Sequence, residues 1–169
     1  MKQLFLGGAR SGKSRMAEQA ASAIAPDYTL IATGWAGDEE MHARINHHRK
    51  SRPASVITLE EPVHLADALQ KTAESAPAIL IDCLTLWLSN CLHESAWRAE
   101  RGRFLEVLNS ISTPVIIVSN EVGSGIVPYG ELTRQFADEA GWLNQEVAKR
   151  CDTVTLVVAG LPLALKNRG

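Results

Sequence analysis

The chain has 169 residues, of which 46% are hydrophobic, and its formal net charge at pH 7 is −2. This length suits one domain, and this hydrophobic content supports a packed core and excludes a disordered chain. The small negative charge provides no overall basic field of the kind that indicates a nucleic-acid-binding protein. We therefore expect a single domain over residues 1–169, with no nucleic acid among its partners.

The sequence also lacks the signals of secretion and of membrane insertion. Its apolar N-terminal run is too short for a signal peptide, and no stretch approaches the roughly 18 consecutive apolar residues of a membrane span. The three cysteines, Cys83, Cys91 and Cys151, have no C-x-x-C spacing. Their number and spacing indicate reduced thiols rather than a zinc site or a disulfide framework. These features predict a cytoplasmic protein without a membrane span.

The first predicted elements are a short apolar strand over residues 4–6 and a helix over Lys13–Ile24. The segment between them reads G-G-A-R-S-G-K-S and matches the phosphate-loop pattern G-x-x-x-x-G-K-[ST] in its expected strand–loop–helix context. The glycines let backbone N–H groups converge on a phosphate, Lys13 can reach the β- and γ-phosphates, and the Ser14 hydroxyl can bind Mg²⁺. The residues predicted to bind nucleotide phosphates are Gly7, Gly8, Ala9, Arg10, Ser11, Gly12, Lys13 and Ser14.

A second strand over residues 28–33 and a helix over residues 38–49 follow. On this helix His47 shares a face with the polar residues three and seven positions before it, whereas His48 lies on the apolar face. His47 is therefore expected to face solvent or a ligand, and His48 to be packed. An exposed histidine often has no function, so the spacing alone leaves a catalytic role for His47 open. The basic residues at 49–52 either bind phosphates or form a solvated turn.

The third predicted strand covers residues 56–59 and is followed by two acids, Glu60 and Glu61. Guanine presents its N1–H and N2–H₂ groups as adjacent donors, so a carboxylate that accepts both would select this base. The alternative is that the acid lies at the N-terminus of the next helix, predicted over residues 62–73, and we prefer this interpretation for Glu61.

The fourth predicted strand covers residues 78–81 and ends in Asp82. An acid at the end of a buried strand is a second feature of phosphate-loop proteins, in which it holds Mg²⁺ directly or through water. The alternative role is a cap for the helix that follows. Given the phosphate loop, we predict that Asp82 and Ser14 hold the metal.

The remaining elements continue the alternation of strands and helices. They are a break-prone helical stretch at 84–108, a strand at 115–119, a helix at 130–150 and a strand over Thr153–Val158. Continuous β-branched runs such as V-I-I-V at 115–118 are typical of strands buried on both faces. The pattern predicts an α/β domain with a mostly parallel central sheet and helices on both faces.

Ligands of such sheets bind at the carboxyl ends of the strands. The residues expected there are Gly7, Thr33, Gly34, Glu60, Glu61, Asp82, Asn120 and Glu121. The glycine-rich segment 120–128 is expected to form an ordered loop at the same edge. The sequence leaves the individual roles of Asn120 and Glu121 open.

Several segments together resemble one family, the bifunctional adenosylcobinamide kinase / adenosylcobinamide-phosphate guanylyltransferases. The phosphate loop alone is unspecific, but R-I-x-H-H at 44–48 and N-E-V-G-x-G-I-V-P at 120–128 are specific when they occur together. The other matching segments lie at 32–34, 38–41, 52–53, 82–90, 118–119, 144–145 and 157–160, so the resemblance covers nearly the whole chain.

The resemblance implies a single RecA-like P-loop NTPase domain that carries out two reactions. Adenosylcobinamide is first phosphorylated by ATP or GTP, and GMP is then transferred from GTP to adenosylcobinamide phosphate, giving adenosyl-GDP-cobinamide and pyrophosphate. GMP rests on a histidine between donor and acceptor, and the first histidine of R-I-x-H-H is His47.

The resemblance also implies further contacts, with Mg²⁺ as the cofactor. Its nucleotide-contact residues beyond the phosphate loop are Thr33, Gly34, Trp35, His48, Arg49, Lys50, Ser51, Glu60 and Asp82. A homo-oligomer is expected, with a trimer favoured, and leucine and tryptophan side chains exposed on the helix at 84–92 would suit a subunit contact.

Two other functions fit parts of the pattern. A monofunctional P-loop small-molecule kinase would need the phosphate loop and Asp82 but no covalent histidine. A nucleotide-switched regulatory module would need no small acceptor, but the chain has no N-K-x-D guanine signature, which weakens this reading.

Overall fold

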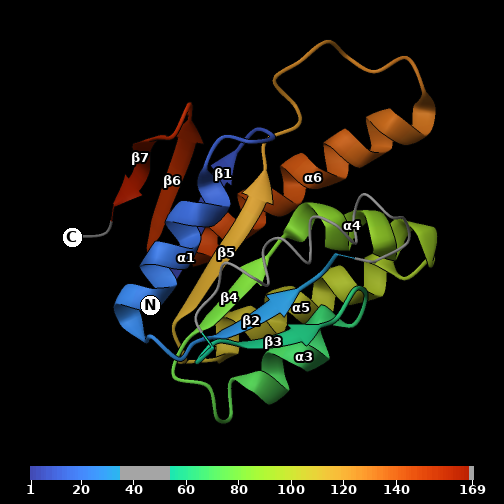
Figure 1. The fold of residues 1–169 in the computed structure, drawn as a ribbon. Coiled ribbons are helices and arrows are strands. Elements are labelled where there is room, and N and C mark those ends of the chain that lie inside the picture. The colour runs from blue at the N-terminus through green and yellow to red at the C-terminus, as the bar shows by residue number, and fades with distance from the viewer. Residues whose placement is uncertain (35–53, 168–169) are drawn as a thin grey trace.

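The computed structural model describes residues 1–34 and 54–167 and is built around one seven-stranded sheet (Figure 1). The strands are β1 (Lys2–Gly7), β2 (Thr29–Ala32), β3 (Ile57–Glu60), β4 (Ile79–Asp82), β5 (Val115–Asn120), β6 (Thr153–Val158) and β7 (Leu161–Asn167). Their order across the sheet is β3-β2-β4-β5-β1-β6-β7. All neighbouring strands are parallel except β6 and β7, which are antiparallel. The prediction of a mostly parallel sheet is confirmed.

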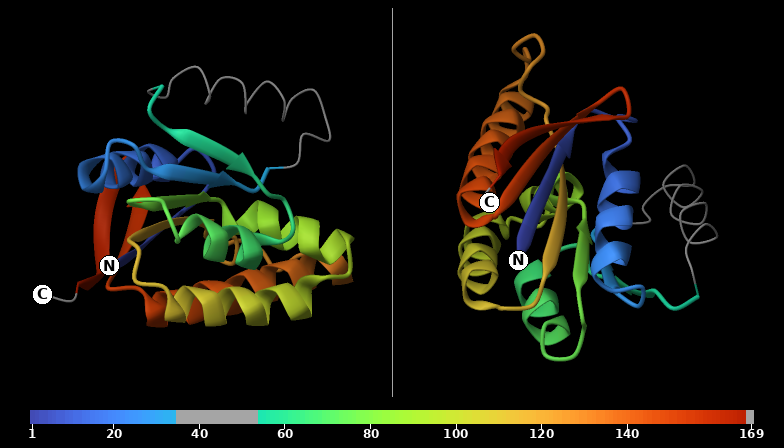
Figure 2. Two further views of the ribbon diagram at one scale, coloured as in Figure 1. Left: turned by 90° about the horizontal axis from the view of Figure 1, so that it is seen from below. Right: turned by 90° about the vertical axis from the view of Figure 1, so that its left-hand side faces the viewer.

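Helices cover both faces of this sheet, as predicted (Figure 2). The described helices are α1 (Lys13–Ile24), α3 (Leu65–Thr72), α4 (Leu84–His93), α5 (Trp97–Ser110) and α6 (Glu131–Arg150). Helix α1 packs on one face, and the other four pack on the opposite face. The break-prone stretch divides into α4 and α5 at residues 94–96, where Ser95 has a φ of 56°. The helix predicted at 38–49 lies outside the described residues.

The core explains why the inner strands read as continuous apolar runs. In β5, Ile116 and Val118 pack beneath α1, while Val115 and Ile117 contact the layer of helices on the other face. All four side chains are fully buried. Because successive side chains of a strand point to opposite faces, a strand covered on both faces buries all of them, and its apolar residues follow one another without alternation.

Strand β7 was not predicted from the sequence. It pairs with β6 through a two-residue connection, Ala159-Gly160, whose φ values are 52° and 76°. Positive φ at both positions is the geometry of a type I′ hairpin turn. Pro162 lacks a backbone N–H, and a proline within a strand is compatible with the edge position that β7 occupies.

Helix α4 is part of the core, which contradicts the expectation that it presents leucine and tryptophan for a subunit contact. Leu84, Trp87 and Leu88 are each 0% exposed. The Trp87 ring lies 5.2 Å from that of Trp97 and 5.0 Å from that of Phe104, between ring centroids. The apolar face of α4, which the sequence analysis expected to contact another subunit, packs instead against α5 of the same chain.

The three cysteines are free, which agrees with their interpretation as reduced thiols, and all three are buried. Burial raises the pKa of the Cys83 thiol to about 11 and that of Cys91 to about 12, so both stay protonated. Among the helices that the structure describes, none is long and apolar enough to span a membrane.

Candidate active site

The loop between β1 and α1 has the geometry expected of a phosphate-binding loop. Gly12 has a φ of 95°, in the left-handed region that favours glycine. A Cβ on Gly7 would lie 2.5 Å from the carbonyl oxygen of Val157 and 2.5 Å from Ser11 Oγ. Side chains are thus excluded at two of the fixed motif positions, because one needs positive φ and the other has no space. Gly8 has no such neighbour, so its place in the loop is not dictated by packing.

Two side chains of this segment, Ser11 and Lys13, are buried within the loop. Lys13 is 9% exposed, and its Nζ donates to the Gly8 carbonyl oxygen at 3.1 Å. Ser11 Oγ is buried and has no hydrogen-bond partner among the described residues. A buried ammonium held by a carbonyl and an unpartnered hydroxyl both fit a phosphate ligand, which supplies strong acceptors for each.

The hairpin between β6 and β7 supports the loop, a contact that sequence reasoning missed. The Gly160 backbone N–H donates to the Ser11 carbonyl oxygen at 2.8 Å. A Cβ on Gly12 would lie 3.4 Å from Gly160 Cα, so the two backbones pass closely. The signal in the sequence is Gly160 itself, whose φ of 76° lies in the left-handed region that favours glycine.

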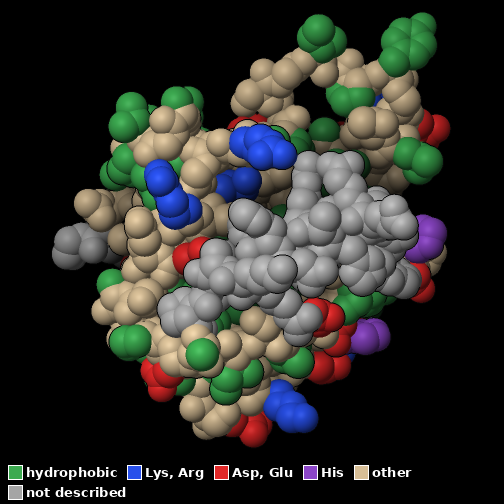
Figure 3. All heavy atoms as spheres, viewed as in Figure 1, with side chains coloured by type: hydrophobic (Ala, Val, Ile, Leu, Met, Phe, Trp, Pro, Cys, Tyr) green, Lys and Arg blue, Asp and Glu red, His purple; other side chains and the backbone are tan. Residues whose placement is uncertain are grey.

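The surroundings of this loop are locally basic although the chain is slightly acidic. Lys and Arg side chains gather over the ends of β1 and α1 on the face shown in Figure 3. The loop and the first turn of α1 contain Arg10, Lys13 and Arg15, of which both arginines are exposed. Together with the positive N-terminal end of α1, these cations favour a polyanion.

Asp82 ends β4 at the same edge of the sheet. It pairs in register with Ala32 of β2 and Val118 of β5. Helix α1, whose first turn contains Ser14, packs over β4 and β5. A carboxylate and a hydroxyl are the hard oxygen donors that Mg²⁺ prefers. The described residues contain no group of three or more His, Cys, Asp or Glu side chains able to hold a metal. The proposed metal-binding role of Ser14 and Asp82 stays a prediction.

Thr33 is bonded to the end of β4 by its side chain. Its Oγ1 donates to the Cys83 carbonyl oxygen at 2.6 Å and accepts the Cys83 backbone N–H at 2.9 Å. The residue is 0% exposed. The hydroxyl is therefore occupied in joining β2 to β4, and the predicted contact between Thr33 and the nucleotide stays a prediction. Gly34, the next residue, is half-buried at this edge.

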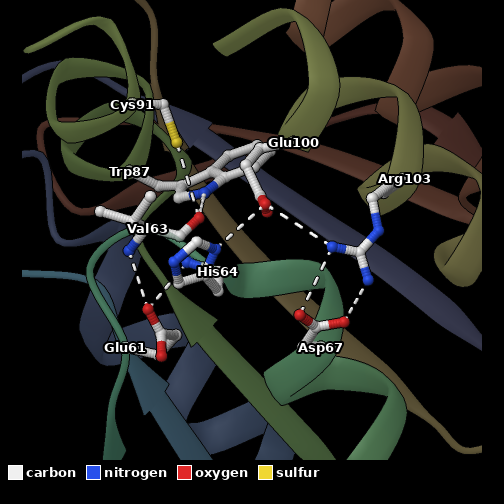
Figure 4. Close-up of polar contacts among 8 residues, drawn as sticks. All are labelled: Glu61, Val63, His64, Asp67, Trp87, Cys91, Glu100 and Arg103. Carbon is white, nitrogen blue, oxygen red and sulfur yellow. Dashed lines mark hydrogen bonds and ion pairs between the residues drawn. The ribbon is translucent and has the colours of Figure 1, made fainter. Parts of the chain in front are cut away.

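The two acids after β3 differ in role. The Glu61 side chain accepts the backbone N–H groups of Val63 and His64 at 3.0 and 2.7 Å, as Figure 4 shows. This confirms the preferred interpretation that Glu61 stabilises the start of the next helix, α3. Glu60 ends β3 and is exposed at the edge, so it stays the candidate for the base.

His64, at the start of α3, is hydrogen-bonded to Glu100 of α5, and the pKa of its imidazole reports on this contact. Its Nδ1 lies 3.1 Å from Glu100 Oε1, and Glu100 is 5% exposed (Figure 4). The hydrogen bond to Glu100, with smaller contributions from Glu61 and Asp67, raises the pKa of His64 above its ordinary 6.5. Because the protonated form is favoured in the folded state, the stabilisation is complete below pH 6.5 and is lost as pH rises through the raised pKa.

Replacement of Glu100 by glutamine is expected to lower the pKa of His64 toward its ordinary value, because the largest cause of the shift is removed. An NMR titration of the imidazole resonances measures this directly. Glu106→Gln on the same helix is the matched control, since Glu106 is exposed and makes no such bond with His64. An unchanged His64 pKa in Glu100→Gln would contradict the assignment.

Asn120 and Glu121 both make local contacts at the end of β5. The Asn120 backbone N–H donates to Thr85 Oγ1 at 2.8 Å, and its carbonyl accepts from Asn144 Nδ2 at 3.1 Å. Glu121 Oε1 accepts from the Gly123 N–H at 2.7 Å and from Ser124 Oγ at 3.2 Å. Glu121 thus orders the glycine-rich loop that the sequence predicted here.

The edge brings together the phosphate loop, Thr33, Gly34, Glu60 and Asp82 from the ends of the four strands β1, β2, β3 and β4 (Figure 1). Six other predicted site residues lie outside the described residues: Trp35, His47, His48, Arg49, Lys50 and Ser51. Their predicted contacts, including the catalytic role of His47, stay predictions.

Comparisons with known proteins agree with this geometry. A family model described as cobinamide kinase / cobinamide phosphate guanyltransferase matches residues 3–165. The chain is 52% identical over 170 residues to the bifunctional adenosylcobalamin biosynthesis protein CobP of Pseudomonas aeruginosa, covering 99% of this chain and 98% of that protein. It is 40% identical over 184 residues to the bifunctional adenosylcobalamin biosynthesis protein CobU of Salmonella typhimurium, covering 98% of this chain and all of that protein.

A likeness to a solved structure concerns the fold alone. The flagellar accessory protein FlaH of Methanocaldococcus jannaschii superposes with a TM-score of 0.54 at 12% identity. The match covers 99% of this chain and 78% of that one. The likeness supports the predicted fold, an α/β domain with a mostly parallel sheet and helices on both faces.

Proposed function

The chain belongs to the cobinamide kinase / cobinamide phosphate guanyltransferase family, and on that basis we propose that it catalyses both reactions at one nucleotide site. It phosphorylates adenosylcobinamide with ATP or GTP and then transfers GMP from GTP to adenosylcobinamide phosphate. The observation that carries the proposal is the family match over residues 3–165, which includes the complete phosphate loop. That loop supplies what both reactions need, a fixed site for a triphosphate.

In the kinase reaction the terminal hydroxyl of the cobinamide attacks the γ-phosphorus, and the bond to the leaving nucleoside diphosphate breaks. Lys13 and the N–H groups of the loop hold the phosphates and offset the negative charge that develops. The Ser11 hydroxyl, unpartnered in the described structure, is available to the same phosphates. Ser14 and Asp82 would hold Mg²⁺, which would neutralise phosphate charge.

In the guanylyl transfer an imidazole nitrogen of His47 attacks the α-phosphorus of GTP, and the bond to pyrophosphate breaks. The phosphate oxygen of adenosylcobinamide phosphate then attacks the same phosphorus and displaces the imidazole. A neutral imidazole nitrogen is a competent nucleophile near neutral pH. Glu60 is proposed to accept the guanine donors, and residues 49–51 to contact the phosphates.

The proposal is tested by incubating the purified protein with adenosylcobinamide, GTP and Mg²⁺ and resolving the corrinoid products by mass. We expect phosphorylated cobinamide first, and then the GDP derivative together with one pyrophosphate for each GMP transferred. Phosphorylated cobinamide alone would instead support the monofunctional kinase. Neither product, with slow hydrolysis of GTP, would support a regulatory module.

A homo-oligomer in the cytoplasm, with a trimer favoured, stays a prediction. The apolar side chains exposed in the described structure lie mainly after β5 and on the β6–β7 hairpin, rather than on α4. They include Ile126, Val127, Tyr129, Leu132, Val158, Leu161, Leu163 and Leu165. Light scattering coupled to size-exclusion chromatography measures the oligomer size.

A further inference from the structure

One side chain, Asn90 on the second turn of α4, joins the ends of two strands at the active edge. Its Nδ2 donates to the Thr33 carbonyl oxygen at 2.8 Å and to the Pro62 carbonyl oxygen at 3.0 Å. Both neighbours are acceptors, so the amide must turn its NH₂ group, and not its oxygen, toward them. Both hydrogens of that group are therefore used.

The two carbonyls follow the strands that carry the proposed nucleoside contacts. Thr33 follows β2 and precedes Gly34, and Pro62 follows Glu60 and Glu61 at the end of β3. Thr33 is bonded in turn to Cys83 after β4. The ends of three strands are thus connected through one network, in which Asn90 is the only link between Thr33 and Pro62 among the described side-chain hydrogen bonds.

Helix α4 also forms hydrogen bonds to Val63, the residue that follows Pro62. Trp87 Nε1 donates to the Val63 carbonyl oxygen at 2.7 Å, and Cys91 Sγ lies 3.6 Å from that oxygen (Figure 4). Trp87 and Cys91 are both 0% exposed. The helix is therefore a rigid support, and Asn90 extends that support from the β3 end across to the β2 end.

The backbone ladder joins β2 to β3 as far as the hydrogen bond from the Glu61 N–H to the Ala32 carbonyl oxygen. We propose that Asn90 is a positioning residue that fixes the two segments just beyond this ladder, at Thr33 and Pro62, to receive the nucleoside of GTP. This inference rests on the proposed function, in which Gly34 and Glu60 contact the nucleotide. The phosphates are held elsewhere, at the end of β1, and β4 and β5 lie between that strand and β2. Loss of the Asn90 bonds therefore weakens the nucleoside end of the site and spares the phosphate end.

Asn90→Leu removes both donors and keeps the branched heavy-atom skeleton of the side chain. We expect GTP to bind about tenfold more weakly, because the Thr33 and Pro62 carbonyls both lose their hydrogen-bond donor, whereas inorganic tripolyphosphate with Mg²⁺ binds within about twofold of wild type. Titration calorimetry measures both affinities, with the α,β-methylene analogue in place of GTP so that no GMP is transferred to the protein during the titration. In steady-state assays the KM for GTP is expected to rise and kcat to change by less than about twofold.

A second variant tests the polarity of the same position. In Asn90→Asp the ionised carboxylate faces two carbonyl oxygens and repels them, whereas its protonated form donates one hydrogen bond. GTP binding by this variant is expected to recover as pH falls, beyond any change in wild type. It keeps the test available if Asn90→Leu does not fold.

The matched control is Thr113→Val, in the loop that precedes β5 and away from the strand ends that form the site. It removes a 3.0 Å hydrogen bond from Thr113 Oγ1 to the carbonyl oxygen of Ala73, the residue after α3. It is expected to lower thermal stability without changing the ratio of GTP to tripolyphosphate affinity. Equal weakening of both ligands in Asn90→Leu, or unchanged GTP binding, would overturn the proposal. Binding is measured without cobinamide, so a wild type that binds GTP but transfers no GMP would contradict only the proposed function.

Discussion

Replacement of Lys13 by methionine is expected to slow both cobinamide phosphorylation and GMP transfer by about 10²- to 10³-fold. The methionine keeps most of the volume of the side chain but removes the ammonium group. Lys13 is nearly buried inside the phosphate loop and is held there by the Gly8 carbonyl oxygen. Because the two reactions use the same triphosphate site in the proposed function, they should fall together. Initial rates with adenosylcobinamide and with adenosylcobinamide phosphate measure the two effects separately.

The control for this variant is Lys149→Met, which removes an exposed lysine near the end of α6. That lysine pairs with Glu146 on the surface, and such pairs contribute little to stability. Lys149→Met is expected to keep both activities. If Lys13→Met lost only one reaction, the two reactions would not share this phosphate loop, and the single-site proposal would have to be abandoned.

The parts of the fold that sequence predicted are those in which local and tertiary preferences agree. Helix α1 begins and ends at Lys13 and Ile24 as expected, because the glycine loop precedes it and helix formers fill it. Strand β5 was predicted because residues 115–118 are all apolar and β-branched, a run that is typical of a strand buried on both faces.

The parts that sequence missed depend on contacts between distant residues. Strand β7 carries Pro162 and follows Ala159-Gly160, not the Asn-Gly or Asp-Gly pair that marks a hairpin in sequence. The burial of Trp87 also depends on α5, because the packing rings of Trp97 and Phe104 come from that helix. An apolar helix face predicts burial but does not identify what buries it.

The candidate site likewise contains a part that local sequence predicts and a part that depends on contacts between distant residues. The phosphate loop is a local motif, so its residues and their roles follow from spacing. The network of Thr33, Cys83 and Asn90 joins residues as far as 57 positions apart, and no spacing rule connects them. The strand order decides which residues lie together at the edge. Sequence predicted that strand ends meet there, but not that β2 lies between β3 and β4.

Replacement of His47 by alanine is expected to abolish GMP transfer, by at least about 10³-fold, while phosphorylation of adenosylcobinamide continues. The imidazole is proposed to hold GMP between GTP and the acceptor, whereas the kinase reaction passes the γ-phosphoryl group directly to a hydroxyl. The variant separates the two activities for this reason. Lys13→Met, in contrast, removes them together.

The decisive measurement is the intact mass of the protein after incubation with GTP and Mg²⁺ in the absence of corrinoid. Wild type should gain one acid-labile GMP, His47→Ala should gain none, and His93→Ala, which removes an exposed histidine at the end of α4, should behave as wild type. A phosphorus–nitrogen bond explains the acid lability, because protonation of the nitrogen makes the imidazole a good leaving group. A GMP adduct that persists in His47→Ala would place the nucleophile elsewhere. GMP transfer at the wild-type rate by His47→Ala would show that the acceptor phosphate attacks GTP directly.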